Sequence, residues 1–342
     1  MTNGADETAT PGPGGPKRWM GLLDEATRRE HRRHNLIHSG VLIGSIAAIT
    51  SIAVYLIWGR LGVVIALTWL FVVAALGPRL RPEAAMRLFR ARQLGPGQGG
   101  QLPMIVDKLA ERAGLPRPPD LYVIPSSTLN SFATGTPDRS AIAVTEGLLR
   151  RMTMREIIGV VGHEMSHIRN NDLSVMTLAD TMTRFVQMLS YAALILVGLN
   201  LIGLLGDEPP FSWWAILLLY LAPAITSVLQ LALSRTREFD ADLEGAMLTG
   251  DPLGLASALR RLDQGTGRFW EDLMYPVPAR RVPVPSLLRT HPSTEERIRR
   301  LVALKPADTM PPLVWIEEPM VSLAGWGPAE LRPRYRWPGV WY

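Results

Sequence analysis

The sequence predicts an α+β protein in which a folded domain is attached to about four membrane-spanning helices. The first observation is a set of apolar runs, each near the roughly 20 residues that cross the hydrocarbon of a bilayer. These runs are residues 36–57, 61–76, 185–205 and 211–233. The second observation is a group of short apolar segments between residues 121 and 145, bounded by turn residues as strands are. The third is a His-Glu-x-x-His pattern at residues 163–167, on a segment that lacks proline and is predicted to be a helix.

Charge and composition limit the classes of function. The formal net charge of +5 comes largely from arginine, and the arginines cluster beside the apolar runs. This pattern favours contact with a membrane surface over nucleic-acid binding, for which no basic motif with interleaved aromatic residues is present. The chain has no cysteine, so a disulfide framework and a thiol nucleophile are excluded. Any zinc ion would be held by histidine and carboxylate.

The start of the chain is expected to be a disordered, basic segment, residues 1–35, because Gly, Pro and Thr dominate its beginning. We do not expect a secretory signal, since the first apolar run begins only at Leu36, behind several arginines. Residues 36–78 are predicted to form a first transmembrane hairpin that turns at Trp58-Gly59-Arg60.

Residues 79–184 are predicted to hold the first part of a cytosolic folded domain. After a Gly-rich linker, residues 102–114 have the spacing of an amphipathic helix with a glycine stop. Strands are expected at residues 121–124, 131–135 and 141–145, the last two joined by a turn. A short helix then begins at Glu146, and the helix of the His-Glu-x-x-His pattern follows.

The His-Glu-x-x-His pattern has the arrangement of a catalytic metal site. Residues four apart lie on the same face of a helix, so His163 and His167 can bind one zinc ion. Glu164 stands where a carboxylate can take a proton from metal-bound water. The alternative is an ordinary helix with one buried and one solvated histidine and a surface glutamate.

Residues 185–233 are predicted to be a second transmembrane hairpin, with two core helices of a large soluble protein as the alternative. Residues 234–304 would then complete the cytosolic domain. Here Glu238 and Asp242 are four apart, so they share a helix face. Glu238 can serve as a third metal ligand, and Asp242 can accept a hydrogen bond from the free ring N–H of a ligating histidine. The alternative is a solvated acidic helix, which is what we expect of Asp240 and Glu244.

Two segments complete the chain. Residues 265–288 are rich in Pro and Gly and are expected to form a mobile flap over the site. Residues 305–342 form a tail rich in Trp and Pro, which either packs back on the domain or lies at the membrane interface.

Several motifs together resemble the HtpX-type membrane zinc endopeptidases, relatives of the CAAX prenyl proteases. The resemblance rests on His163-Glu164-Met165-Ser166-His167 and on the segment from Ser234 to Asp242. Residues 130–135, Asn-Ser-Phe-Ala-Thr-Gly, are similar to the family's Asn-Ala-Phe-Ala-Thr-Gly, with Ser131 as a departure. A late His-Pro motif, residues 291–298, also matches. The resemblance covers roughly residues 36–304.

The resemblance implies a zincin-like fold of the group whose third ligand is a glutamate, with one Zn²⁺ per chain on His163, His167 and Glu238. It implies that Glu164 is the general base and that the strand at residues 130–134 is a sheet edge that binds substrate. The further residues it suggests include alternatives. Asn130, Phe132 and Ala133 would contact substrate, with a turn residue before the strand as the alternative for Asn130. His291 would stabilise the oxyanion or cap the next helix. Arg297 would pair with a carboxylate such as Glu238 or Asp242, with contact to substrate as the alternative.

The expected function is therefore zinc-dependent endoproteolysis of misfolded or surplus membrane proteins, as a form of protein quality control. The partners would be polypeptides and the lipid bilayer, without nucleic acid. The distribution of arginine places both termini and the site in the cytosol, in a multi-pass protein of the inner (plasma) membrane. Two rivals are a CAAX-type protease, which would have more spans, and a non-catalytic membrane adaptor that holds zinc only for its fold.

Overall fold

The structure of the 342-residue chain is a computed structural model. It describes residues 25–76, 82–95, 97–204, 211–274, 293–304 and 310–315, and two short paired strands, Tyr335–Arg336 (β5) and Val340–Trp341 (β6). His291 and the second half of the expected flap, from residue 275, lie outside the described residues.

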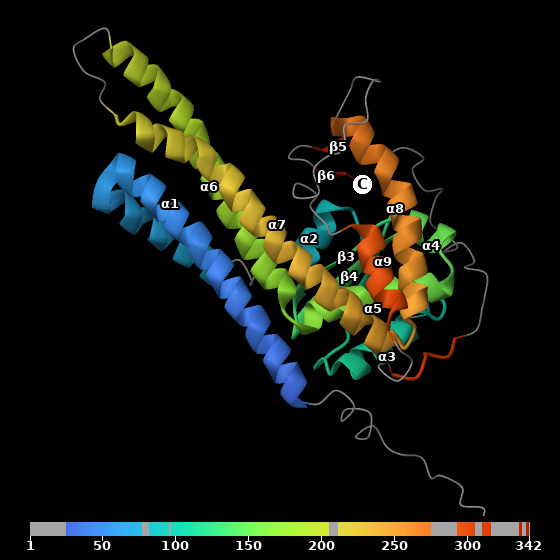
Figure 1. The fold of residues 1–342 in the computed structure, drawn as a ribbon. Coiled ribbons are helices and arrows are strands. Elements are labelled where there is room, and N and C mark those ends of the chain that lie inside the picture. Colours follow the sequence, from blue (N-terminus) through green and yellow to red (C-terminus); the bar gives the residue numbers. More distant parts are fainter. Residues whose placement is uncertain are drawn as a thin grey trace, which may run out of the picture.

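The described chain has an elongated part and a compact part (Figure 1). Three long helices, α1 (Glu25–Leu76), α6 (Asp172–Gly203) and α7 (Trp213–Thr249), pack side by side and project away from the rest. The compact part holds the sheet and the shorter helices. Because α6 begins and α7 ends inside the compact part, these two helices connect both parts without a break.

A four-stranded mixed sheet lies in the compact part. The strands are β1 (Arg92–Gln93), β2 (Asp120–Ile124), β3 (Ser131–Thr136) and β4 (Arg139–Thr145), in the order β1-β2-β4-β3. β2 and β4 are parallel, and the other two pairs are antiparallel. β3 is therefore an edge strand, as expected. The two-residue strand β1 was not predicted, since so short a segment carries no period-2 pattern.

The two faces of the sheet are covered unequally. The main core lies beneath α3 (Leu102–Ala113) and α5 (Met154–Arg169), where Ile142 and Val144 pack against Leu109 and Ile157. On the opposite face α2 (Pro82–Leu88) covers a smaller cluster around Tyr122 and Ala143. The rings of Phe89 and Phe132 lie 4.8 Å apart there.

The first hairpin turns where the sequence predicted. Gly59 has φ 64° and ψ −154°, a left-handed conformation that favours glycine, and the helix resumes directly after it. The helix also extends further toward the N-terminus than expected. Residues 25–35, assigned to the disordered segment, belong to α1, because Glu, Ala and Arg are strong helix formers.

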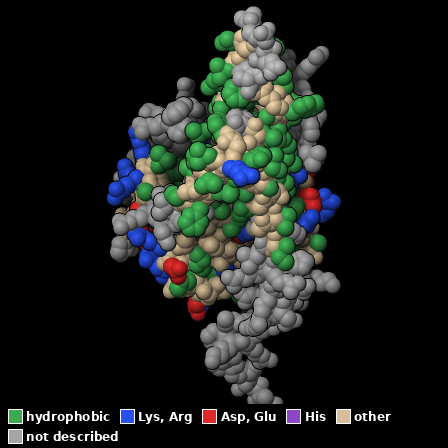
Figure 2. Space-filling view, turned by 90° about the vertical axis from the view of Figure 1, so that its left-hand side faces the viewer, with side chains coloured by type: hydrophobic (Ala, Val, Ile, Leu, Met, Phe, Trp, Pro, Cys, Tyr) green, Lys and Arg blue, Asp and Glu red, His purple; other side chains and the backbone are tan. Residues whose placement is uncertain are grey.

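The helices α6 and α7 are each long and apolar enough to cross a membrane, and together they contain nearly all of both runs predicted for the second hairpin. Within α1, residues 43–56 and 58–69 are shorter apolar helices. Side chains such as Ile195, Ile202 and Trp214 are exposed on this part of the molecule, and Figure 2 shows hydrophobic side chains covering most of its visible face. Exposed apolar surface of this extent marks contact with lipid or protein.

The helices α5 and α7 cross at two glycines. A Cβ atom on Gly245 would lie 2.8 Å from the backbone nitrogen of His163, and one on Gly162 would lie 2.5 Å from Thr249 Cγ2. Neither position has room for a methyl group, so the two backbones approach more closely than larger residues allow. The crossing brings the last turns of α7 directly beside His163.

The end of the described chain closes over these helices. After α4 (Glu146–Arg151) and the long helices, α8 (Pro252–Met274) packs on α5 and on α9 (Thr294–Val302). Residues 265–274, expected to begin the flap, are helical, because the first proline after the start of α8 is Pro276. Residues 310–315 run along the end of α7, where the Leu313 N–H donates to the carbonyl oxygen of Thr249 at 3.2 Å.

The glycine crossing gives a stability prediction. Gly245→Ala should lower the free energy of unfolding by about 1–3 kcal/mol, because the added methyl group meets backbone atoms of α5 that cannot move aside. Thermal unfolding of the detergent-purified protein measures the effect. Gly198→Ala in α6 is the control, since a Cβ there has open space within 4 Å. Equal unfolding temperatures for both variants would show that the crossing tolerates a side chain.

Candidate metal centre

The helix α5 presents the His-Glu-x-x-His residues to the interior of the compact part. Its start is fixed by a capping box, in which Glu156 accepts a hydrogen bond from the Thr153 N–H at 2.9 Å and Thr153 accepts one from Glu156. Burial raises the pKa of Glu156, but hydrogen bonds from Ser257 and Thr153 outweigh it and the pKa is lowered. The helix ends at Arg169, and Asn171 takes a left-handed conformation (φ 55°) that turns the chain into α6.

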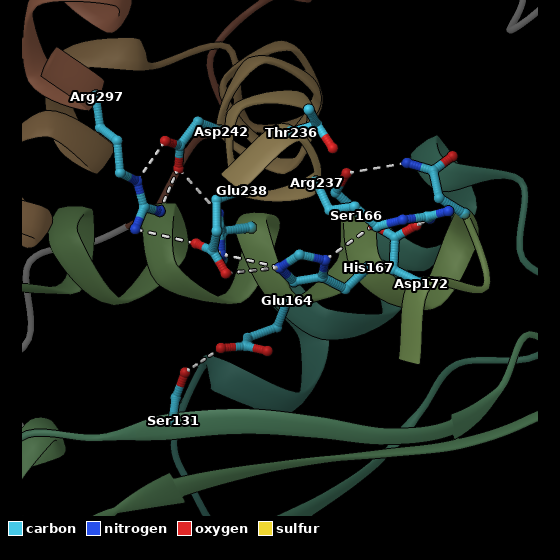
Figure 3. Close-up of polar contacts among 12 residues, drawn as sticks. Ser131, Glu164, Ser166, His167, Asp172, Thr236, Arg237, Glu238, Asp242 and Arg297 are labelled. Atoms are coloured by element: carbon cyan, nitrogen blue, oxygen red, sulfur yellow. Dashed lines mark hydrogen bonds and ion pairs between the residues drawn. The ribbon is translucent and has the colours of Figure 1, made fainter. Parts of the chain in front are cut away.

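Three side chains from two helices converge at this position. The Nε2 atoms of His163 and His167 lie 3.2 Å apart. Glu238, on α7, places its carboxylate oxygens 3.6 Å from His163 Nε2 and 3.9 Å from His167 Nε2. One ligand atom from each residue lies within 4.8 Å of the others, which suits a metal ion. Figure 3 shows His167 and Glu238 facing one another above Glu164.

Each imidazole has a buried carboxylate on its other side. His167 Nδ1 lies 3.0 Å from Asp172 Oδ2 in a hydrogen bond. His163 Nδ1 lies 3.0 Å from Asp242 Oδ1, within ion-pair distance but not aligned for a hydrogen bond. In neutral imidazoles, carboxylates in these positions favour the tautomer with the proton on Nδ1, which leaves a lone pair on each Nε2. The two lone pairs and the carboxylate of Glu238 then face one another and repel unless a cation lies among them.

Two buried arginines compensate part of the negative charge. Arg297, on α9, makes two 2.6 Å hydrogen bonds to Asp242 and lies 3.0 Å from Glu238. Burial lowers the pKa of the Arg297 guanidinium, but the Asp242 hydrogen bonds outweigh it and the pKa is raised above its usual value. Arg237 pairs with Asp172.

The charge count supports a divalent ion at this site. The carboxylates of Glu164, Asp172, Glu238 and Asp242 outnumber the guanidinium groups of Arg237 and Arg297 by four to two. A divalent cation would balance this excess of carboxylates. Two nitrogen ligands at about 2.0–2.1 Å from a tetrahedral zinc ion would lie about 3.3 Å from each other. This distance is close to the 3.2 Å between the Nε2 atoms of His163 and His167. The residues therefore fit a metal such as zinc.

Glu164 lies on the side of α5 that faces the edge strand. Its Oε1 accepts a 2.8 Å hydrogen bond from Ser131 Oγ on β3 (Figure 3). Ala133 follows on the same face of the strand and is buried in the main core. Phe132 points the other way, onto the α2 face, so its side chain is directed away from Glu164. Asn130 precedes the strand and is exposed.

Three features were not found from the sequence. Asp172 as the partner of His167 was missed, although it stands only five residues further along, because its direction depends on the turn at Asn171. Ser131 was noted only as a departure from a motif. Glu244 was expected to be solvated, but its side chain accepts a 2.7 Å hydrogen bond from Ser166 and pairs with Arg169. Glu244 lies on α7, which packs against α5. The acidic composition of the segment does not reveal this packing.

Known proteins resemble this chain over most of its length. The profile of peptidase family M48 matches residues 96–305, which include α5, α7 and α9. A protease HtpX homolog of Desulfatibacillum aliphaticivorans is 36% identical over 281 residues, covering 80% of this chain and 90% of that protein. One from Acaryochloris marina is 37% identical over 281 residues, covering 79% and 95%.

A third homolog, from Kineococcus radiotolerans, is 35% identical over 300 residues, covering 80% of this chain and 98% of that protein. Among solved structures, the crystal structure of S. mikatae Ste24p aligns with a TM-score of 0.46 and 20% identity, covering 84% of this chain and 66% of that one. The profile match and the identity over nearly the whole length of the HtpX homologs confirm the family resemblance: the chain belongs to peptidase family M48 and is a metallopeptidase.

Proposed function

We propose that this metallopeptidase is a zinc endopeptidase of the membrane, with the ion held by His163, His167 and Glu238. The observation that carries the proposal is the approach of two imidazole Nε2 atoms to 3.2 Å, with a carboxylate beside them and a further carboxylate behind each ring. Structural zinc sites use four protein ligands, whereas three ligands leave a position for reaction.

Glu164 is the proposed general base. When bound, zinc supplies a Lewis acid that polarises the scissile carbonyl. Glu164 takes one proton from the attacking water and passes it to the leaving amine, so the carboxylate ends in its starting state. Asp172 and Asp242 orient the imidazoles, and Arg297 holds Asp242 in place. His291 remains a candidate for oxyanion stabilisation, as the resemblance suggested.

The edge strand β3 is the proposed binding site for an extended substrate. The Thr145 N–H donates to the Asn130 carbonyl oxygen at 3.0 Å, so these two residues form a hydrogen-bonded pair at one end of the antiparallel strands β3 and β4. Along such strands, pairs of opposite residues that are hydrogen-bonded to each other alternate with pairs that are not. The backbone groups of Ser131 and Ala133 therefore point away from β4, toward the free edge, where a peptide can add as a further strand. This register favours main-chain recognition by Ser131 and Ala133 over a contact with the side chain of Phe132.

The substrates we propose are segments of misfolded or surplus membrane proteins. Asp172 begins α6 and Glu238 lies in α7, and each helix continues directly into an apolar stretch that can cross a bilayer. The metal site would thus lie near the membrane surface. With α1 contributing two further spans, the chain would cross four times, and the arginine distribution would keep the site and both termini in the cytosol.

Glu164→Gln should abolish cleavage while zinc content and fold persist. The amide is nearly isosteric but cannot take a proton, so turnover should fall at least about 10²- to 10⁴-fold. Digestion of casein by the detergent-purified protein, with chelator and with zinc restored, measures this. Wild-type activity in the variant would remove Glu164 from the role of base.

Glu238→Ala should lose bound zinc and activity together, because it removes one of three ligands. Asp242→Ala should weaken zinc binding by about 10- to 100-fold, because it removes the carboxylate behind His163. Bound zinc measured by atomic absorption separates the two. Asp240→Ala, on the same helix, is the matched control and should keep a full equivalent. A full equivalent of bound zinc in the Glu238→Ala variant would exclude Glu238 as a ligand.

The topology has a direct test because the chain has no cysteine. Ser212→Cys lies at the predicted outer end of α7, and Lys108→Cys lies on α3 in the compact part; both positions are exposed. An impermeant thiol reagent applied to intact cells should label the first variant and spare the second until the cells are permeabilised. Labelling of Lys108→Cys in intact cells would place the site on the outer side.

A further inference from the structure

We infer that Ser131 is a positioning residue that orients the carboxylate of Glu164 for proton transfer. The inference rests on the proposed role of Glu164 as general base and goes beyond it. Three observations support it: the contact itself, the hydrogen bonds that anchor the strand on which Ser131 lies, and the hydroxyl group that this residue type supplies.

The contact is short and specific. Ser131 Oγ lies 2.8 Å from Glu164 Oε1. Among the described residues, no other group forms a hydrogen bond with the Glu164 side chain. An ionised carboxylate only accepts, so the hydroxyl group must be the donor. Hydrogen bonds to a charged acceptor are stronger than neutral ones. With Oε1 occupied by Ser131, Oε2 is left to receive the proton.

The strand holds the hydroxyl group in a fixed place. Immediately before Ser131, the Asn130 N–H donates to the buried Thr145 Oγ1 at 3.1 Å, and the Asn130 carbonyl accepts from the Thr145 N–H. Thr145 Oγ1 in turn donates to the Thr128 carbonyl oxygen at 2.6 Å. Successive side chains of a strand point to opposite faces, so this anchored register directs Ser131 toward α5.

The residue type decides whether this link can form. Alanine at this position could not donate a hydrogen bond, so the link between strand and base depends on the serine found here. Ser131 also presents its backbone N–H and C=O to the free edge of β3. One residue therefore connects the proposed substrate strand to the base.

The proton balance is simple. When Glu164 takes a proton from water on Oε2, Ser131 keeps its own proton and continues to donate to Oε1, which is then a carbonyl oxygen. When the proton moves to the leaving amine, the original state returns. Ser131 gains and loses no proton, so it acts through the orientation of Glu164 and not as an acid or base itself.

The expected signature is a change in kcat with little change in KM. Ser131→Ala preserves the backbone that would pair with substrate but frees the Glu164 carboxylate to rotate. We expect kcat for an internally quenched peptide to fall about tenfold, with KM within about twofold. Ser131→Thr retains the hydroxyl group and should recover most of the kcat. Ser257→Ala removes a serine–glutamate hydrogen bond of the same kind, 2.7 Å to Glu156 Oε1, away from the site; it is the control and should leave both constants unchanged.

A double-substitution cycle tests whether Ser131 acts through Glu164. Glu164→Asp shortens the base and withdraws it from Ser131, so adding Ser131→Ala to it should lower kcat less than twofold. Equal tenfold losses in both backgrounds would show that Ser131 acts elsewhere and would overturn the inference. So would an unchanged kcat in Ser131→Ala.

Two measurements distinguish this inference from neighbouring explanations. Zinc content and the unfolding temperature of Ser131→Ala should equal those of the unaltered protein; a loss of either that parallels the loss of activity would make the role structural and contradict the inference. Full activity in Glu164→Gln would instead contradict the proposed function itself. An inactive Glu164→Gln together with a fully active Ser131→Ala would leave the function standing and remove only the role of Ser131.

Discussion

The close crossing of α5 and α7 is the constraint on which the site depends. His163 and His167 belong to one helix, but Glu238 and Asp242 belong to another that follows a long hairpin. Only a backbone approach at Gly162 and Gly245 brings these groups within a few ångströms. A helix that carried larger side chains at the crossing would stand further away, and the glutamate would not reach the imidazoles.

Once the helices are this close, the site becomes a buried ionic network. Asp172, Asp242 and Glu238 are all buried, and buried charges are costly unless each has a partner. Arg237 and Arg297 supply partners from inside the fold, and a divalent ion would supply the remaining positive charge. The network thereby ties metal binding to folding, because removing any one member leaves another buried charge without compensation.

The same helices join the chemistry to the apolar part of the molecule. α6 starts with Asp172, which is hydrogen-bonded to His167, and the C-terminal part of α7 carries the proposed third ligand Glu238 together with Asp242. Each helix runs without interruption into a stretch of exposed apolar side chains. The position of Glu238 relative to the two imidazoles on α5 is therefore tied to the position of this hairpin.

Much of this protein was predictable from local sequence. Residues four apart share a helix face wherever they occur, so the pairs His163–His167 and Glu238–Asp242 were predicted without knowledge of the fold. The apolar runs of α6 and α7, the three longer strands and the turn at Gly59 were predictable for the same reason, since each depends on periodicity or on one residue's backbone preference.

The sequence did not decide the contacts between helices and strands. Asp242 was expected to lie behind one of the imidazoles, but that it faces His163 depends on the packing of α7, and that Asp172 faces His167 depends on the left-handed turn at Asn171. The direction of Phe132 depends on strand register, and the link from Ser131 to Glu164 depends on where β3 lies against α5. Short-range periodicity indicated the candidate ligands, whereas only the tertiary structure decided which groups lie behind the imidazoles, because those contacts depend on the backbone turn at Asn171 and on the packing of α7 against α5.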